Sequence, residues 1–179
     1  MSKVKKIILR IAIAIIVICG GITFLIYSVL KNNDQRKAYA ETFGSGDKKA
    51  FVMYQPSSTD VMKNITDNYV RGLVDAGYTV DVTYPDLEKE YDVSQYDLVS
   101  YGSPVYGGKA LDIMKKCVEK ITNYKDGIQV FLYTTGVDNK EKEMDGFKKA
   151  VQYSNVTTQK IYVNSKTKLE EAYEMGAGK

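Results

Sequence analysis

The sequence predicts an α/β protein in which one transmembrane helix precedes a doubly wound domain built on a five-stranded parallel sheet. Two observations predict this class. Residues 11–30 contain no charged side chain. From Lys49 onward, short apolar runs alternate with segments of helical periodicity, which is typical of a parallel sheet covered by helices on both faces. We therefore divide the chain into a basic tail (1–10), a membrane helix (11–30), a linker (31–48) and one domain (49–179).

The apolar segment at residues 11–30 is long enough to cross a bilayer. In a helix these residues rise about 30 Å, the thickness of the hydrocarbon core. A cleaved signal peptide has a shorter apolar core with a small-residue cleavage site close behind it, whereas Ala38 and Ala40 lie well beyond this segment. We therefore expect a retained, single-pass anchor in the cell membrane, with the lipid bilayer as the partner of residues 11–30.

Positive charge is concentrated in the N-terminal part of the chain. Residues 1–47 carry seven Lys/Arg and three Asp/Glu, whereas residues 48–179 carry eighteen and nineteen. This bias slightly favours a cytoplasmic N-terminus with the domain outside, but it leaves the side of the membrane open. The domain itself is close to neutral, so we expect no nucleic-acid partner.

The composition excludes several kinds of chemistry. The chain has no histidine and only two cysteines. Without histidine there is no Ser-His-Asp or Cys-His nucleophile pair and no zinc site built on imidazole. Two cysteines cannot form a multi-bridge framework, and we interpret Cys117 as a small core residue. We predict no catalytic side chain and no metal site.

The elements of the domain follow from the spacing of its apolar residues. Compact apolar runs predict buried strands, and apolar residues three or four positions apart predict helices. Val80 and Val82 alternate with polar neighbours, as in a half-exposed edge strand, and Gly102 is expected to end the third strand. The expected strands are 50–54, 79–84, 98–101, 129–133 and 159–163, and the expected helices lie at about 62–76, 111–121, 144–151 and 169–173.

Ligands of such sheets bind beyond the carboxyl ends of the strands, at the point where the strand order reverses. Three segments are expected there, residues 55–60, 102–108 and 134–137, and two of them are rich in small and hydroxyl residues. The sequence therefore predicts a ligand pocket at this edge of the sheet.

These three segments resemble the corresponding parts of flavodoxins. Residues 96–109 (YDLVSYGSPVYGGK) resemble the third strand and the loop along one side of the flavin ring, and residues 131–136 (FLYTTG) resemble the fourth strand and the loop on the other side. Residues 52–60 (VMYQPSSTD) occupy the family's phosphate-binding position. The resemblance covers about residues 48–163. It implies strand order 2-1-3-4-5 and flavin mononucleotide (FMN) as a non-covalent cofactor.

The resemblance also implies which residues bind the cofactor. Hydroxyls and amides at a helix N-terminus suit a phosphate, glycines let the backbone approach a flat ring, and Tyr106 is expected to stack on that ring. The segment 134–136 is equally consistent with an ordinary turn. The expected cofactor-binding residues are Ser57, Ser58, Thr59, Ser103, Pro104, Val105, Tyr106, Gly107, Thr134, Thr135 and Gly136.

Two positions depart from the family pattern, because Ser58 stands where flavodoxins have a glycine and Asp60 where they have a threonine. A carboxylate about 4 Å from a phosphate costs about 4 kcal/mol at an effective dielectric near 20, unless Asp60 caps the helix and points away. Three functions stay open. They are a membrane-tethered FMN protein that exchanges electrons with a redox protein partner, a binding or scaffold module that has lost FMN, and a flavin-dependent reductase of a small substrate such as a quinone.

Overall fold

The computed structural model describes residues 3–34, 38–138 and 140–178. The chain divides into two compact units, residues 1–36 and 37–179. The start of the expected basic tail, residues 1–2, and part of the expected linker, residues 35–37, lie outside the described residues.

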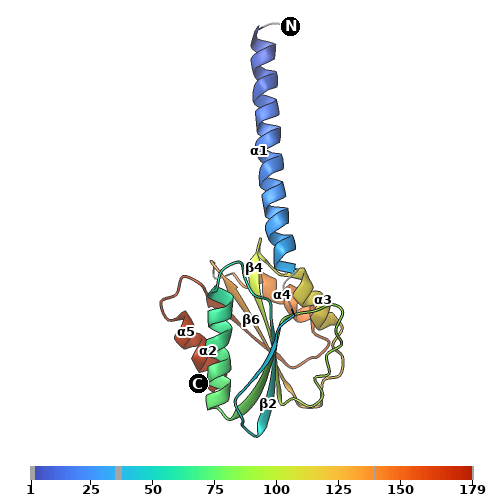
Figure 1. The fold of residues 1–179 in the computed structure, drawn as a ribbon, viewed down its shortest axis with the longest axis vertical. Helices are drawn as coiled ribbons and strands as arrows, with labels where there is room; N and C mark the ends of the chain where they lie inside the picture. The colour runs from blue at the N-terminus through green and yellow to red at the C-terminus, as the bar shows by residue number, and fades with distance from the viewer. Residues whose placement is uncertain (1–2, 35–37, 139, 179) are drawn as a thin grey trace. The chain divides into compact units, whose positions relative to one another are not determined.

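The first unit is formed by helix α1 (Lys3–Asp34), which takes in most of the expected basic tail (Figure 1). The large apolar side chains described between Ile11 and Tyr27 are exposed, and Ile16 and Phe24 each keep 70% of their surface accessible. Judged on the residues that are described, none of the helices is both long enough and apolar enough to cross a bilayer. The expectation of a transmembrane helix at residues 11–30 is therefore not supported.

The second unit is a seven-stranded, mostly parallel sheet with helices on both faces (Figure 1). Its five parallel strands lie in the order β3-β2-β4-β6-β7. Numbered among themselves along the chain, these strands have the expected order 2-1-3-4-5, so the α/β prediction is confirmed although the strand count is larger. The parallel strands are β2 (Lys48–Tyr54), β3 (Tyr78–Thr83), β4 (Leu98–Tyr106), β6 (Gln129–Gly136) and β7 (Val156–Tyr162).

Two antiparallel strands were not expected. Strand β1 (Ala40–Phe43) pairs with β3, and β5 (Lys109–Ala110) pairs with β4. Residues 40–43 were expected to be linker, but they cover the open edge of β3 instead. The stacked rings of Tyr39 and Tyr84, 4.6 Å apart, hold the start of this strand to the sheet. Covering an edge strand removes its unpaired backbone groups from solvent.

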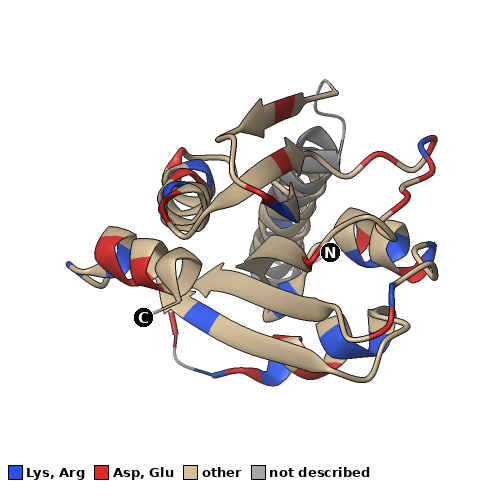
Figure 2. Ribbon diagram, turned by 90° about the horizontal axis from the view of Figure 1, so that it is seen from below, with Lys and Arg blue, Asp and Glu red and all other residues tan. Residues whose placement is uncertain are grey.

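Each face of the sheet is covered by a pair of helices (Figure 1). Helices α2 (Val61–Asp75) and α5 (Lys168–Ala177) cover one face, and α3 (Asp112–Glu119) and α4 (Lys142–Ala150) cover the other. Strand β2 packs against both sides, because its successive side chains point to opposite faces. Phe51 and Met53 join the core with Cys117, which is buried as expected, whereas Val52 joins the other core. Figure 2 shows acidic and basic residues interspersed over the helices and connections of this unit.

Tyrosines occupy the positions in this core that need a large side chain with a polar end. The hydroxyl of Tyr69 lies 2.6 Å from the Ser100 hydroxyl, and that of Tyr133 lies 2.9 Å from the Thr66 hydroxyl. Buried hydroxyls are stable only when hydrogen-bonded, and these partners satisfy them. Desolvation by burial raises the pKa of Tyr124 to about 12 and holds the pKa of Tyr69 and Tyr133 well above the ordinary value.

We expect the domain to lose stability at alkaline pH because of these tyrosines. A phenol whose pKa is higher in the folded than in the unfolded chain stabilises the fold fully below the unfolded pKa of about 10, and this stability falls as pH rises above it. The last part of the tyrosinate absorbance change should coincide with loss of circular dichroism. Ionisation of all tyrosines with a midpoint near pH 10 and an unchanged dichroism spectrum would show that these side chains are not buried.

Candidate functional site

The three segments expected to form a pocket meet at the carboxyl edge of the sheet. The Gln55 N–H donates to the Gly102 carbonyl at 2.9 Å, which joins the end of β2 to β4. Ser103 of β4 is the register partner of Thr134 of β6. The sheet therefore brings together the loops that the resemblance assigned to the phosphate and to the two sides of a ring.

In the first segment, between β2 and α2, one hydroxyl makes hydrogen bonds that stabilise the loop itself. Ser57 is buried, and its Oγ donates to the Thr59 carbonyl at 2.6 Å and accepts from the Met62 N–H at 3.4 Å. Ser58 and Thr59 are exposed. Of the three residues expected to meet a phosphate, Ser57 thus shapes the loop, while Ser58 and Thr59 face outward from it.

Asp60 does not cap α2 with its side chain, so the condition under which its carboxylate would avoid a phosphate is not met in this way. A capping residue usually has extended backbone angles, which let its side chain reach back to the second or third amide of the helix. Asp60 has φ −75° and ψ 2° and makes no side-chain capping bond. Ser57 accepts from the Met62 amide instead. Capping therefore does not remove the repulsion between the Asp60 carboxylate and a phosphate at this loop.

The second segment is a β-hairpin. Strand β4 continues past Gly102 to Tyr106, and a two-residue turn at Gly107 and Gly108 leads into β5. These glycines have φ of 58° and 73°, the left-handed values that a type I′ hairpin turn requires. Gly102 does not end the strand as expected, because β4 stays paired with β6 through Pro104. A glycine is needed at this position for packing, since a Cβ there would lie 2.2 Å from Cζ of Tyr133.

Tyr106 links the second segment to the first. Its hydroxyl accepts from the Ser58 N–H at 3.2 Å and lies 3.3 Å from the Ser58 hydroxyl. The Tyr106 hydroxyl oxygen thus already accepts a hydrogen bond from an amide of the segment assigned to the phosphate. The backbone of this segment presents a donor to an oxygen, which is what a phosphate-binding loop must do.

The hydroxyls expected at the ring make internal hydrogen bonds. Ser103 Oγ accepts from the Leu111 N–H and donates to the Pro104 carbonyl, both at 3.0 Å. Thr134 Oγ1 donates to Glu143 at 3.1 Å, and Thr135 Oγ1 lies 3.6 Å from Met62 Sδ. All three side chains are buried. Their contribution to a ligand would therefore come from their backbone groups.

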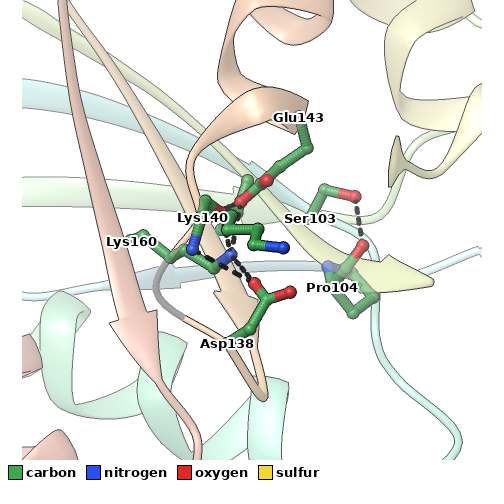
Figure 3. A network of polar contacts seen from close by, with 7 residues as sticks. Ser103, Pro104, Asp138, Lys140, Glu143 and Lys160 are labelled. Atoms are coloured by element: carbon green, nitrogen blue, oxygen red, sulfur yellow. Dashed lines mark hydrogen bonds and ion pairs between the residues drawn. The ribbon is translucent and has the colours of Figure 1, made fainter. Parts of the chain in front are cut away.

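A buried ion pair that the sequence did not predict lies at this edge (Figure 3). Lys160 Nζ lies 3.0 Å from Glu143 Oε1 and 2.9 Å from Asp138 Oδ1. The Lys160 and Glu143 side chains are 4% and 2% exposed. Burial alone would lower the pKa of Lys160, but its hydrogen bonds to Asp138 and Glu143 outweigh burial and raise it. The sequence offers one indication of this pair, because Lys160 lies inside an expected strand. A lysine whose side chain faces a covering helix is buried and requires an acidic partner.

Four cavities of the domain lie away from these segments. One cavity of about 260 Å³ lies between α2 and β1. The three others, of about 380–500 Å³, lie at different parts of the domain. None of these four is lined by an expected cofactor-binding residue. The first is lined by Tyr39, Phe43, Gly44, Asp67, Val70, Arg71, Val74 and Val82.

The chain is similar to known proteins over most of this unit. The flavodoxin domain family matches residues 58–175. The two-electron reduced flavodoxin of Megasphaera elsdenii is 18% identical, with a TM-score of 0.55 over 73% of this chain and 99% of that one. Oxidised Flavodoxin 2 of Bacillus cereus is 16% identical, with a TM-score of 0.53 over 72% and 94%. An NAD(P)H:quinone oxidoreductase of Methanothermobacter marburgensis is 11% identical, with a TM-score of 0.54 over 73% and 98%. At these identities the likeness shows only that the three structures and this chain share a fold. No curated protein sequence matches the chain.

Proposed function

We propose, from the premise that this chain belongs to the flavodoxin domain family, that it binds FMN non-covalently and transfers electrons to or from a redox protein partner. The observation that carries this proposal is the contact between Ser58 and Tyr106. It brings the phosphate segment and the ring segment together, with an amide directed at an oxygen.

The chain's own part in this function is binding and orientation. FMN, when bound, supplies one- or two-electron chemistry. Ser58, Thr59 and the first amides of α2 would hold the phosphate. Tyr106 would lie along one side of the ring, and the backbone at the end of β6 along the other. No side chain has to transfer a proton for electron transfer, which agrees with a chain that lacks histidine.

We further propose that residues 11–30 attach the domain to the lipid bilayer of the cell membrane, on a side that stays open. The support is the absence of charge in this segment and the exposure of the large apolar side chains described between Ile11 and Tyr27. In cells, the full chain should stay with membranes after carbonate extraction, whereas residues 38–179 alone should be recovered in the supernatant. Release of the full chain by carbonate would contradict this attachment.

Replacing Asp60 with threonine should tighten FMN binding about fivefold, because an exposed carboxylate near a phosphate repels it by about 1 kcal/mol in water. Riboflavin lacks the phosphate, so its affinity should not change. Both dissociation constants can be measured by quenching of flavin fluorescence. The matched control is Asp126→Thr, which removes an exposed carboxylate that precedes β6 at the other edge of the sheet and should alter neither constant.

A colourless protein that binds no FMN at micromolar concentration, either unchanged or as Asp60→Thr, would refute the electron-transfer proposal. The second candidate, a flavodoxin-fold binding or scaffold module without a cofactor, would then remain. It is favoured by the internal hydrogen bonds of Ser57, Ser103 and Thr134. It is also favoured by Asp60, whose carboxylate makes no capping bond to α2 and would repel a phosphate.

A further inference from the structure

We propose that Lys160 is a positioning residue for the cofactor site, because its ammonium group holds the connection between β6 and α4 against the carboxyl edge of the sheet (Figure 3). This inference rests on the proposed function, since the same connection is the one assigned to the second side of the flavin ring. Lys160 itself belongs to β7.

The ammonium group of Lys160 has three hydrogens and three acceptors. It donates to Asp138 Oδ1 at 2.9 Å, to the Lys140 carbonyl, and to Glu143 Oε1 at 3.0 Å. These acceptors are spread from just after β6 to the first turn of α4. One side chain therefore fastens both ends of the connection to β7.

The position of Lys160 continues a row of polar side chains across the sheet. Ser103 of β4 pairs in register with Thr134 of β6, which pairs with Lys160 of β7. Thr134 Oγ1 donates to the same Glu143 oxygen that Lys160 contacts. Glu143 thus joins two neighbouring strands to α4.

The Lys160 side chain requires a glycine at position 136, which is an expected ring contact. A Cβ at Gly136 would lie 2.9 Å from Cε of Lys160, 3.3 Å from its Nζ and 3.7 Å from Cβ of Val105. A contact of 2.9 Å with carbon is too short, so a glycine leaves the space through which the lysine side chain passes. The lysine side chain therefore passes directly beside Gly136, a residue of the expected ring site.

The contacts of Lys160 differ in their value for stability. Glu143 is buried with Lys160, so removal of either charge leaves the other buried without its partner, which is strongly destabilising. Asp138 is 58% exposed, and exposed ion pairs contribute little to folding. The Asp138 contact can therefore be removed to release the connection while the fold and the buried pair are retained.

The test compares Lys160→Met and Asp138→Ala with Lys125→Met in the full chain. Lys125 also forms an ion pair, with Asp97 at 2.6 Å, but it is exposed and precedes β6 at the other edge of the sheet. FMN and riboflavin affinities are measured by fluorescence, and hydrogen exchange of peptides that contain residues 136–142 is measured without flavin.

Lys160→Met should weaken the binding of FMN and of riboflavin by the same factor, about tenfold. This is the lower end of the loss in affinity seen at metal sites when a residue that supports a ligand is removed. Asp138→Ala should weaken both flavins to a smaller extent. Both variants should speed exchange in the connection, whereas Lys125→Met should change neither quantity. Equal losses for the two flavins place the effect at the ring, which both share, and Lys160→Arg should restore part of the affinity.

Each result separates this inference from the proposed function. Failure of the unchanged protein to bind FMN would overturn both. Normal FMN binding with unaltered affinity and exchange in Lys160→Met and Asp138→Ala would overturn the role of Lys160 alone. A loss confined to FMN would also overturn it, because the effect would then lie at the phosphate. If Lys160→Met does not fold, Asp138→Ala decides, since it keeps the buried pair.

Discussion

Replacement of Gly176 by alanine is expected to destabilise the domain by about 2–3 kcal/mol, the upper range for an overpacked core. Helices α2 and α5 touch backbone to backbone at this glycine. A Cβ at Gly176 would lie 2.1 Å from the Tyr69 carbonyl oxygen and 2.8 Å from the Leu73 nitrogen. Neither atom belongs to a flexible side chain, so the two helices must move apart and lose contacts along their length. Urea unfolding at neutral pH measures the change.

The same substitution at Gly146 provides the control. Gly146 lies in α4, and a Cβ there would meet nothing within 4 Å. Alanine is a better helix former than glycine, so Gly146→Ala should stabilise the domain by about 0.5–1 kcal/mol. Gly72→Ala, on the facing side of the α2–α5 contact, should destabilise as Gly176→Ala does. Similar small effects at all three positions would contradict the close approach of these helices.

The five parallel strands and four helices could be predicted because each has its own local signal, whereas the order of the strands was implied by the resemblance to flavodoxins. Strand β1 could not, since residues 40–43 (AETF) carry no apolar run. Its pairing depends on contacts with residues some 40 positions away, such as the hydrogen bond from Thr42 Oγ1 to Asp81. Pairings of this kind exist only after the sheet has formed.

The place of the candidate site could also be predicted, whereas its polar contacts could not. The strand pattern locates the carboxyl edge, and the hydroxyl-rich segments lie there as expected. Which hydroxyl bonds to which partner depends on backbone angles that the sequence does not reveal. At Asp60 these angles prevent a cap, and Ser57 accepts from the Met62 amide in its place. The partners of Lys160 come from α4 and from the connection that precedes it, so their meeting with a side chain of β7 requires the packed structure.

Gly102→Ala should destabilise the domain by about 3 kcal/mol, because overpacking here meets a side chain that cannot move away. A Cβ at Gly102 would lie 2.2 Å from Cζ and 2.5 Å from the hydroxyl oxygen of Tyr133. Tyr133 is fully buried, and its hydroxyl is hydrogen-bonded to Thr66. Displacing the ring would break that bond and disturb the core beneath α2. Urea unfolding again gives the loss.

A second variant separates this packing role from an approach of Gly102 to a flavin. Tyr133→Leu removes the ring atoms that a Cβ at residue 102 would strike, at the expense of some packing. The double variant Gly102→Ala/Tyr133→Leu should therefore be more stable than the sum of the single losses predicts, with a coupling of about 1–3 kcal/mol, as for residues in contact. Additive losses would show that Tyr133 is not what requires a glycine here. The requirement would then come from outside the core, where the ring of a cofactor is proposed to lie.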